Sequence, residues 1–288
     1  MSKLTTSQDI SQFLASANKV EARGILDTIE TEDLVGLTLI VQEDYTVKGY
    51  IGDIPANFAA TNSYTTAKGL SLGSSVTSIG SDAFSSCEGF TGSLNIPNSV
   101  TTIGSGAFSD CTGFNGSLTL PTNPAFTTIG EYAFEGCTEF TGSLVIPDSV
   151  TSIGDGAFDS CQNITGDLTI PNSVTTIGQF AFFASGFNGS LTLPTNPLFT
   201  SIGYYAFGSC DGFTGSLVIP DSVTSIGSYA FYGCTGFTSV SINRAVAPTI
   251  GSGAFSGMSA VIPAEIHVPF GATGYAASYD GFTVVYDL

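Results

Sequence analysis

The fold of this chain is decided by residues 143–161, which read SLVIPDSVTSIGDGAFDSC. The centre of this stretch, an Ile-Gly pair followed two residues later by Ala-Phe, occurs eight times at spacings of 24 to 26 residues. The isoleucines of the eight copies are Ile79, Ile103, Ile129, Ile153, Ile177, Ile202, Ile226 and Ile250. A fixed period of this length predicts a solenoid, in which each copy forms one coil and stacking buries a continuous core.

Each copy is expected to contain a short strand, a turn and one helical or 3-10 turn. Leu144 and Ile146 alternate with outward-facing neighbours, which is the period of a strand with one face inward. Pro147 has no N–H for a ladder and therefore ends the strand. Ala157 and Phe158 then carry the apolar content back to the core, and we expect the turn of helix there.

The repeat phenylalanines and cysteines predict the interior of the stack. The eight phenylalanines from Phe84 to Phe255 should form a buried file, each stabilising the fold by ~1.5–3 kcal/mol. Three residues after the repeat Phe, two copies have Ser185 and Met258, and a position that accepts Ser or Met is not a metal-ligand set. We therefore expect free, buried thiols and no disulfides at the six cysteines, Cys87, Cys111, Cys137, Cys161, Cys210 and Cys234.

The charge of the chain restricts its partners. Only 10% of the residues are charged, and 24 acidic residues against 6 basic ones give a formal net charge of −18. Such a field repels phosphate backbones and anionic lipids, so we expect no nucleic-acid partner. The first residues show no secretory leader, and no apolar run reaches the ~18 residues of a membrane span, so we also expect no membrane insertion.

The repeat pattern S-L-x-I-P-x-S-V-T-x-I-G-x-x-A-F-x-x-C resembles the BspA-type leucine-rich repeat of bacterial surface adhesins, parasite surface proteins and marine viral sequences. The resemblance covers residues 69–288 and implies an α/β repeat solenoid. That fold is a right-handed leucine-rich-repeat coil of short parallel strands and helical or 3-10 turns, capped at both ends. It implies a curved surface used for binding, without implying any one ligand.

This resemblance divides the chain into three parts. Residues 1–68 are expected to form an N-terminal attachment or capping region of helices and strands, and residues 69–263 form the eight repeats. Residues 264–288 are the C-terminal cap, which resembles that of the family: a last strand, Val-Pro, a turn and a short helix.

The N-terminal part offers two interpretations. Residues 17–26, ANKVEARGIL, resemble a short motif near the start of phage tail-fibre and other virion-attachment proteins, although Asp27 stands where that motif usually ends in glycine. The alternative is a solenoid cap, which every repeat array needs over its first coil. The candidate attachment residues are Ile10, Phe13, Leu14, Arg23 and Leu26.

Aromatic side chains in the variable slots around Ala-Phe are the candidate binding residues. Pairs such as Phe180 and Phe183 would share one face of a helix. Contiguous exposed aromatic side chains mark recognition patches, whereas partial burial between coils is the alternative. The outward positions of the strands, which are small and mostly neutral, are a second candidate surface. The aromatic candidates are Tyr132, Phe180, Phe183, Tyr204, Tyr205, Tyr229 and Tyr232.

No catalytic constellation is visible in the sequence. His267 is the only histidine, there is no tryptophan, and no nucleophile, base and orienting group converge in one motif. We therefore predict a protein that is not an enzyme and that needs no cofactor and no metal.

The function predicted from the sequence is that of a surface-presenting protein. The first choice is a phage fibre or attachment protein on the virion surface, which recognises a host surface protein or glycan through its repeats. It would bind other virion proteins through its N-terminal region and form a homo-oligomer. The alternatives are an adhesin on the surface of a bacterium or protist, or a purely structural spacer subunit.

Overall fold

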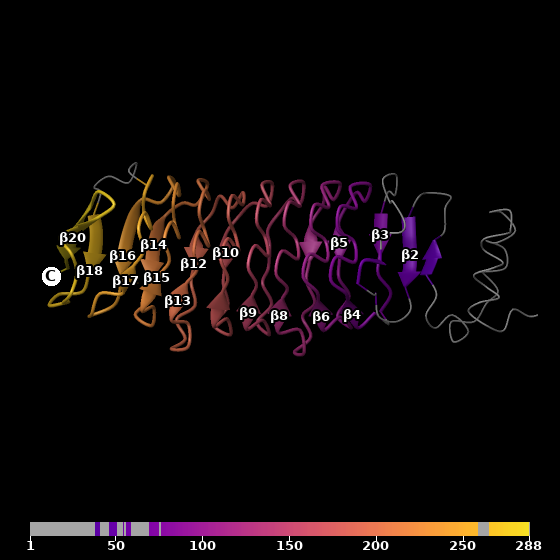
Figure 1. The fold of residues 1–288 in the computed structure, drawn as a ribbon, viewed down its shortest axis with the longest axis horizontal. Helices are drawn as coiled ribbons and strands as arrows, with labels where there is room; N and C mark the ends of the chain where they lie inside the picture. Colours follow the sequence, from indigo (N-terminus) through magenta and orange to yellow (C-terminus); the bar gives the residue numbers. More distant parts are fainter. Residues whose placement is uncertain are drawn as a thin grey trace, which may run out of the picture.

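A computed structural model describes residues 69–74, 76–258 and 265–287, with residues 54 and 56–58 and the backbone of 38–40 and 46–50. Within this part, the repeats stack as coils along one long axis (Figure 1). The predicted attachment residues, which all precede residue 38, lie outside the described residues. The predicted solenoid is confirmed, with one coil for each Ile-Gly pair.

The longest ladder runs through the Ile-Gly segments, which the sequence had not marked as strands. In this ladder Ile153 pairs in parallel register with Ile129 on one side and Ile177 on the other. It forms two sheets, of five strands and three strands. The strands are β4 (Ser78–Ile79), β6 (Thr102–Ile103), β8 (Thr128–Ile129), β9 (Ser152–Ile153), β11 (Thr176–Ile177), β13 (Ser201–Ile202), β15 (Ser225–Ile226) and β17 (Thr249–Ile250).

The expected Ser-Leu-x-Ile strands form a second parallel ladder. Their alternation is confirmed: Leu144 and Ile146 are buried while Ser143 and Val145 are exposed, even though this copy has no assigned strand. The strands of this ladder are β5 (Leu94–Asn95), β7 (Leu118–Thr119), β10 (Leu168–Thr169), β12 (Leu191–Thr192), β14 (Ser216–Ile219) and β16 (Ser239–Ile242).

Strands also lie at both ends of the described stack. β1 (Thr38–Ile40) is antiparallel to β2 (Thr46–Tyr50), which is parallel to β3 (Gly69–Ser71). At the other end β18 (Glu265–Val268) continues the ladder after β16, and β20 (Phe282–Tyr286) follows it. β19 (Ser278–Tyr279) is antiparallel to β20.

The prediction of a short helix in the C-terminal cap is wrong. Residues 269–281 contain no helix, and β19 and β20 form a hairpin instead. Its two loop residues, Asp280 and Gly281, have φ angles of 48° and 91°. An Asp-Gly pair with positive φ is typical of a tight hairpin turn, because its twist matches that of the flanking strands.

The prediction of a helical or 3-10 turn at each Ala-Phe segment is also wrong. Alternate residues send their N–H groups to different coils: Phe158 donates to the Ala181 carbonyl of the next coil (2.8 Å), whereas Asp159 donates to Gly156 (3.0 Å). The segment is bounded by Gly156 and Ser160, whose φ angles are 57° and 59°. A helix needs negative φ throughout and bonds within itself, so this backbone forms a turn shared between coils.

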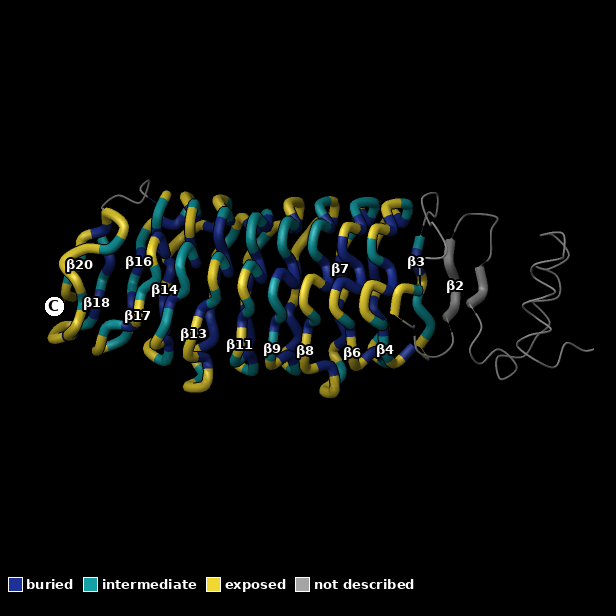
Figure 2. Tube along the Cα trace, in the orientation of Figure 1, coloured by how far each residue is buried: buried dark blue, intermediate teal, exposed yellow. Residues whose placement is uncertain are grey.

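The predicted phenylalanine file is confirmed. Its eight rings, from Phe84 to Phe255, are at most 1% exposed. Neighbouring rings stack with centroids 5.2 to 6.0 Å apart and planes within 11° of each other. They lie in the buried interior that runs along the stack in Figure 2.

A second file of rings was missed. Five of its six rings stand at the third residue after the cysteine, and Phe187 stands two residues after Ser185, so the period of the repeat could have revealed the file. Its rings stack between neighbouring coils and meet the first file edge to face, as Phe134 and Phe140 do at 6.5 Å. Ile164 takes the ring's place in one coil. The second file consists of Phe90, Phe114, Phe140, Phe187, Phe213 and Phe237.

The six cysteines are buried and unpaired, in agreement with the predicted ladder. Each of the last five donates its thiol proton to the repeat-Phe carbonyl of the preceding coil; the Cys161 Sγ to Phe134 O distance is 3.2 Å. The Ser185 hydroxyl makes the same bond to Phe158 at 2.6 Å. Among the described residues no group of His, Cys, Asp and Glu side chains could hold a metal ion. The same residues contain no helix that is long and apolar enough to span a bilayer.

Candidate binding surface

Three adjacent coils bring six of the seven predicted aromatic residues together. We call this group the aromatic cluster: Phe180, Phe183, Tyr204, Tyr205, Tyr229 and Tyr232. Tyr132 stands two coils away, where its ring lies against Gly156 of the next coil. The prediction that these side chains share a helix face is wrong, since the coils contain no helix. They meet because the same turn recurs from coil to coil.

The centre of the cluster is a stack of three rings. The centroids of Phe180 and Tyr205 are 5.3 Å apart with their planes 5° apart, and those of Tyr205 and Tyr229 are 4.8 Å apart at 16°. The other three rings meet this stack edge to face. Phe183 packs on Phe180 and Tyr205, Tyr204 lies 4.7 Å from Tyr205, and Tyr232 lies 5.9 Å from Tyr229.

The rings of the cluster pack against one another between adjacent coils, and their outer side is exposed to solvent. Tyr204 and Tyr232 are 38% and 41% exposed, and the other four rings are half-buried. The rings therefore bury area against neighbouring coils, and they also present an aromatic surface to solvent.

The backbone under the central stack has a conformation that aromatic residues rarely adopt. Phe180, Tyr205 and Tyr229 have φ angles of 55°, 51° and 57°. The same slot, immediately before Ala-Phe, holds Gly106, Gly156 and Gly253 in other coils. A left-handed conformation costs a residue with a Cβ roughly 1–2 kcal/mol relative to glycine. The stack is therefore built where the backbone favours glycine.

One glycine completes the cluster. A Cβ atom at Gly208 would lie 2.6 Å from Cδ1 of Tyr205 and 3.1 Å from Cδ2 of Phe183. The equivalent slot of other coils holds a side chain, for example Ser109 or Tyr232. The missing side chain lets the rings of adjacent coils close over the backbone.

The preceding coils carry acids along the same edge. Glu131 and Asp155 occupy the slot of Tyr204, and Glu135 and Asp159 occupy the slot of Phe183 and Tyr232. Burial raises the pKa of Glu135, and the charges of Asp159 and Asp110 raise it further. Burial also raises the pKa of Asp159, although the 2.8 Å hydrogen bond that it accepts from the Ser160 hydroxyl lowers this pKa.

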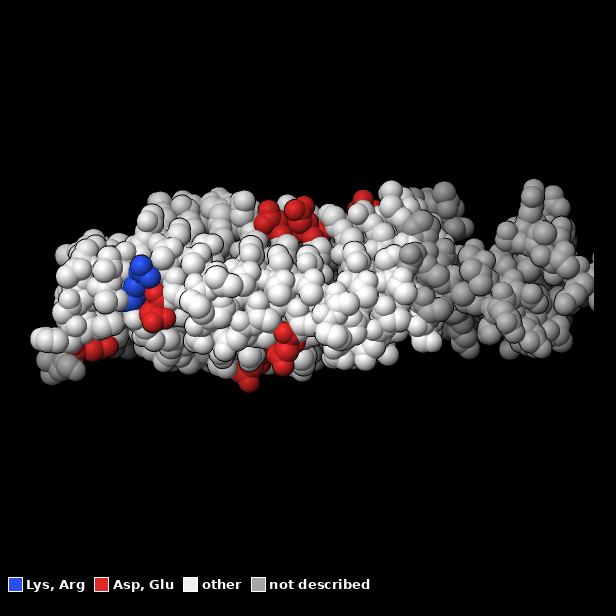
Figure 3. Space-filling view, turned by 90° about the horizontal axis from the view of Figure 1, so that it is seen from below, with Lys and Arg blue, Asp and Glu red and all other residues white. Residues whose placement is uncertain are grey.

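Basic side chains are nearly absent from this surface. Arg244 is the only Lys or Arg in residues 69–287, and its Nη1 donates to the Asp221 carbonyl (2.8 Å). Figure 3 shows acidic side chains in separate groups on a face that is otherwise mostly uncharged. The acids of the turn edge therefore have no basic partner among these residues.

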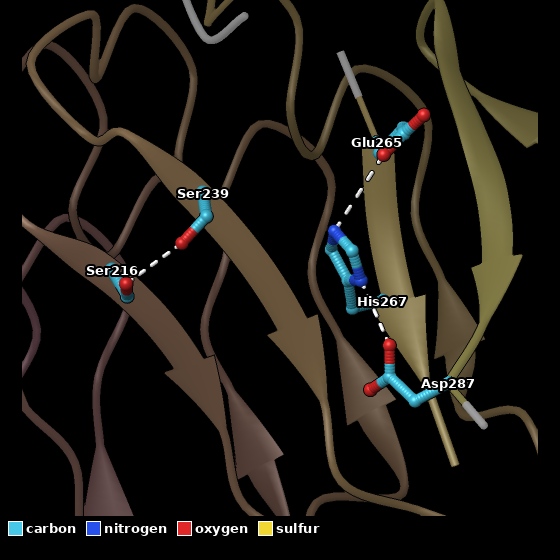
Figure 4. Close-up of polar contacts among 5 residues, drawn as sticks. All are labelled: Ser216, Ser239, Glu265, His267 and Asp287. Atoms are coloured by element: carbon cyan, nitrogen blue, oxygen red, sulfur yellow. Dashed lines mark hydrogen bonds and ion pairs between the residues drawn. The ribbon is translucent and has the colours of Figure 1, made fainter. Parts of the chain in front are cut away.

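The second candidate surface, the strand face, is exposed and hydroxyl-rich. Ser93 and Ser117 are joined by a 3.2 Å hydrogen bond, and Ser216 and Ser239 by one of 2.7 Å (Figure 4). Val145 is 71% exposed at this face. These contacts tie neighbouring coils together.

His267 lies on the half-buried, outward side of β18, between the buried Ile266 and Val268. Its Nδ1 lies 2.8 Å from Oδ1 of Asp287, and its Nε2 lies 3.7 Å from Oε2 of Glu265 (Figure 4). Both carboxylates were missed from the sequence: Asp287 follows a different strand, β20, whereas Glu265 stands two residues before His267 on β18, so its spacing could have revealed it. The dashed lines from the imidazole in Figure 4 run to these two carboxylates, and Ser216 and Ser239 are joined to each other.

The repeats match a family model described as the BspA type leucine rich repeat region, in six copies over residues 58–187 and 200–267. The chain belongs to this BspA-type family. The match to the BspA-type model starts at residue 58, so it does not include the segment compared above with phage tail fibres.

Two solved structures are similar to this BspA-type protein. One is a leucine-rich repeat protein from Bacteroides ovatus, at 21% identity and a TM-score of 0.35, covering 82% of this chain and 76% of that one. The other is a leucine rich cell surface protein from Faecalibacterium prausnitzii, at 19% identity and a TM-score of 0.37, covering 87% and 96%. A comparison with curated proteins gave no match.

Proposed function

We propose that this BspA-type protein is a non-enzymatic surface protein, extracellular or bound to a cell, which binds a partner macromolecule through the aromatic cluster. The observation that carries the proposal is the set of three aromatic residues at positive φ in adjacent coils. Residues held in sparsely populated backbone conformations gather at ligand-binding sites, where the fold supports their strain. Coils of the same fold with Gly156 or Gly253 in that slot stack without such a residue.

The surface location is supported by the family. BspA-type repeats occur in bacterial surface adhesins and parasite surface proteins, and a rigid array of coils suits contacts that are spread over a long surface. Many weak contacts then add up, and their effect is multiplied where several copies stand on one cell.

A virion location is the second candidate, and the observation that favours it is the segment ANKVEARGIL at residues 17–26. A labelled antibody against the repeats, applied to cells and to virus particles from the source, separates the two locations. Label on particles supports the virion role, and label confined to cell surfaces excludes it.

The binding role is tested with a variant that uses only residues native to the same slots. It combines Tyr204→Ser, Tyr205→Gly, Tyr229→Gly and Tyr232→Ser, which copies the coil containing Gly253. We call this the cluster variant. Binding of the labelled protein to bacterial and animal cells should fall about ten-fold or more, the loss of a binding hot spot.

The matched control changes two exposed residues of the strand face, Val145→Thr and Val218→Thr, because Thr occupies this position in other coils. The control should bind like the parent protein, and both variants should keep its melting temperature. Undiminished cell binding by a folded cluster variant would contradict the proposal, and loss in the control alone would move the site to the strand face.

A further inference from the structure

The turn edge of the solenoid changes from acidic to aromatic between two adjacent coils, those of Ile153 and Ile177. Before this point the variable slots hold Asp110, Glu131, Glu135, Asp155 and Asp159, which we call the acidic zone. After it, the next three coils hold the aromatic cluster. All of these acids except Asp110 use slots that the aromatic cluster also uses, so the two zones lie in line along one edge.

Hydrogen bonds place the two zones in direct contact. Oδ1 of Asp155 accepts a 2.8 Å hydrogen bond from the backbone N–H of Gln179, which precedes Phe180. The backbone N–H of Ser160, next to Asp159, donates to the Phe183 carbonyl at 2.8 Å. The last acids and the first rings are therefore one coil apart, about 4.8 Å.

The acids of this edge are crowded, and none of them forms an ion pair with a base among the described residues. Glu135 and Asp159 are half-buried, and the raised pKa of Glu135 reflects burial and two neighbouring carboxylates. A cation placed here would be attracted by several charges at once, in surroundings that screen them less than water does. The charge of the edge therefore selects a basic ligand.

The stacked rings argue against a sugar. Tyr205 has a ring on each side, and Tyr229 lies between Tyr205 and Gly253, where a Cβ would collide with its ring. The faces of these two central rings, on which a sugar would stack, are thus occupied by other rings and by backbone. The exposed parts of Tyr204 and Tyr232 remain open, and aromatic surface of this kind suits apolar side chains.

We propose that the turn edge binds a basic polypeptide segment in extended form, with its Lys and Arg heads on the acidic zone and its apolar side chains on the aromatic cluster. This inference rests on the proposed function, because it names the ligand of the same cluster. Six coils cover about 24 Å from first to last, and an extended chain advances about 3.3 Å per residue. A segment of roughly seven to ten residues would therefore span both zones.

The test uses the full chain and a fluorescent peptide of about ten residues, four arginines followed by a Gly-Gly pair and four leucine or phenylalanine residues. Fluorescence anisotropy gives its affinity for the parent, for the cluster variant and for Asp155→Asn/Asp159→Asn. Asparagine keeps the side-chain oxygen that accepts from Gln179 and removes only the charge. Either change should weaken binding about ten-fold or more.

A charge-matched control separates this edge from general attraction by a chain of charge −18. The variant Asp148→Asn/Asp221→Asn also removes two negative charges, but from exposed turns elsewhere on the coils. We expect it to weaken peptide binding less than about three-fold, because separated surface charges are screened by salt. Equal losses in the two acid-to-amide variants, or no peptide binding by the parent, would overturn the inference.

The cell-binding assay keeps the two proposals apart. If the cluster variant loses cell binding while the Asp155→Asn/Asp159→Asn variant keeps it, the cluster is a binding site but its ligand is not basic. Binding of the parent to a neutral glycan on an array, unchanged by the two acid substitutions, would likewise replace the polypeptide with a sugar. If the cluster variant keeps cell binding, the proposed function itself fails.

Discussion

At the residue scale, Cys161 donates its thiol proton to the Phe134 carbonyl, and Ser185 makes the same bond to Phe158 one coil later. The third position after the repeat Phe therefore accepts a small side chain that can donate a hydrogen bond, although Met258 occupies it in the last coil. This contact explains why serine can replace cysteine in the ladder.

The exchange can be tested at Cys161. Cys161→Ser should change the free energy of unfolding by less than about 1 kcal/mol, because the hydroxyl replaces the donor. Cys161→Ala removes the donor and leaves a small cavity, so it should cost about 1–3 kcal/mol. Urea titration measures both variants, and a serine variant as unstable as the alanine variant would show that size, not donation, selects the residue.

The thiols should also make stability depend on alkaline pH. Burial raises the pKa of Cys87 and of Cys210 from 9.0 to about 12 in the folded protein. Because the unfolded chain then loses its thiol protons first, the free energy of unfolding should be fully present below pH 9 and fall as the pH rises towards 12.

Urea midpoints between pH 7 and pH 10 measure this fall, and replacement of all six cysteines by serine is the control. The control should lose the thiol part of the pH dependence. Thiol reagent should find six groups in the denatured chain without reductant, since we predict no disulfides. A count of two or fewer would contradict the ladder of free thiols.

Tyr205→Gly separates strain from packing in the aromatic cluster. Glycine should relieve roughly 1–2 kcal/mol of left-handed backbone cost, and the lost ring contacts should remove a similar amount. We therefore expect the free energy of unfolding to change by less than about 1 kcal/mol. A loss above about 3 kcal/mol in thermal or urea unfolding would mean that the ring is a core element instead of a surface one.

At the element scale, the unit is a coil with two strands and a turn whose N–H groups bond alternately within the coil and to the next coil. The apolar side of each coil is completed only by its neighbours. Every ring of the first phenylalanine file stacks on the next, and the second file does the same on either side of Ile164. Stability is therefore shared between adjacent coils, as in other repeat arrays.

Phe158→Ala tests this sharing, because Phe158 stacks on Phe134 and on Phe182 at 5.4 and 5.5 Å. The substitution should cost about 3–5 kcal/mol and increase hydrogen exchange in the coils on both sides. The control is Phe270→Ala, at a side chain that is 79% exposed, which should leave both measurements unchanged. An unchanged melting transition for Phe158→Ala would contradict the stacking of Phe158 between Phe134 and Phe182.

At the scale of the whole molecule, the acids of residues 69–287 far outnumber the bases, so they repel one another along the stack. The net charge is −18, and Arg244 is the only Lys or Arg between residues 69 and 287. Self-repulsion destabilises a compact state, and salt screens it.

Raising the ionic strength from about 0.01 to 0.15 M should therefore raise the melting temperature. The Asp155→Asn/Asp159→Asn variant should respond less than the parent, and a non-ionic osmolyte of equal osmolality is the control for solvent effects. A melting temperature that falls with salt would show that these acids are stabilised by attraction instead.

The sequence by itself determined the repeat period, the number of coils, the first phenylalanine file and the burial of the cysteines. All of these depend on a pattern in which each residue keeps its place from copy to copy. Single slots could also be compared between copies, which is how Tyr204, Tyr205 and Tyr229 were found before any geometry was known.

Only the tertiary structure decided the backbone of the turns and the arrangement of the rings. Spacing of apolar residues suggested a helix at Ala157-Phe158, but the N–H of Phe158 has its partner 23 residues away, at Ala181. Local periodicity carries no information about such a partner, whereas buried backbone groups must find one. The same bonds between coils hold the turn residues in the left-handed conformation, and they stack Phe180, Tyr205 and Tyr229 into one surface.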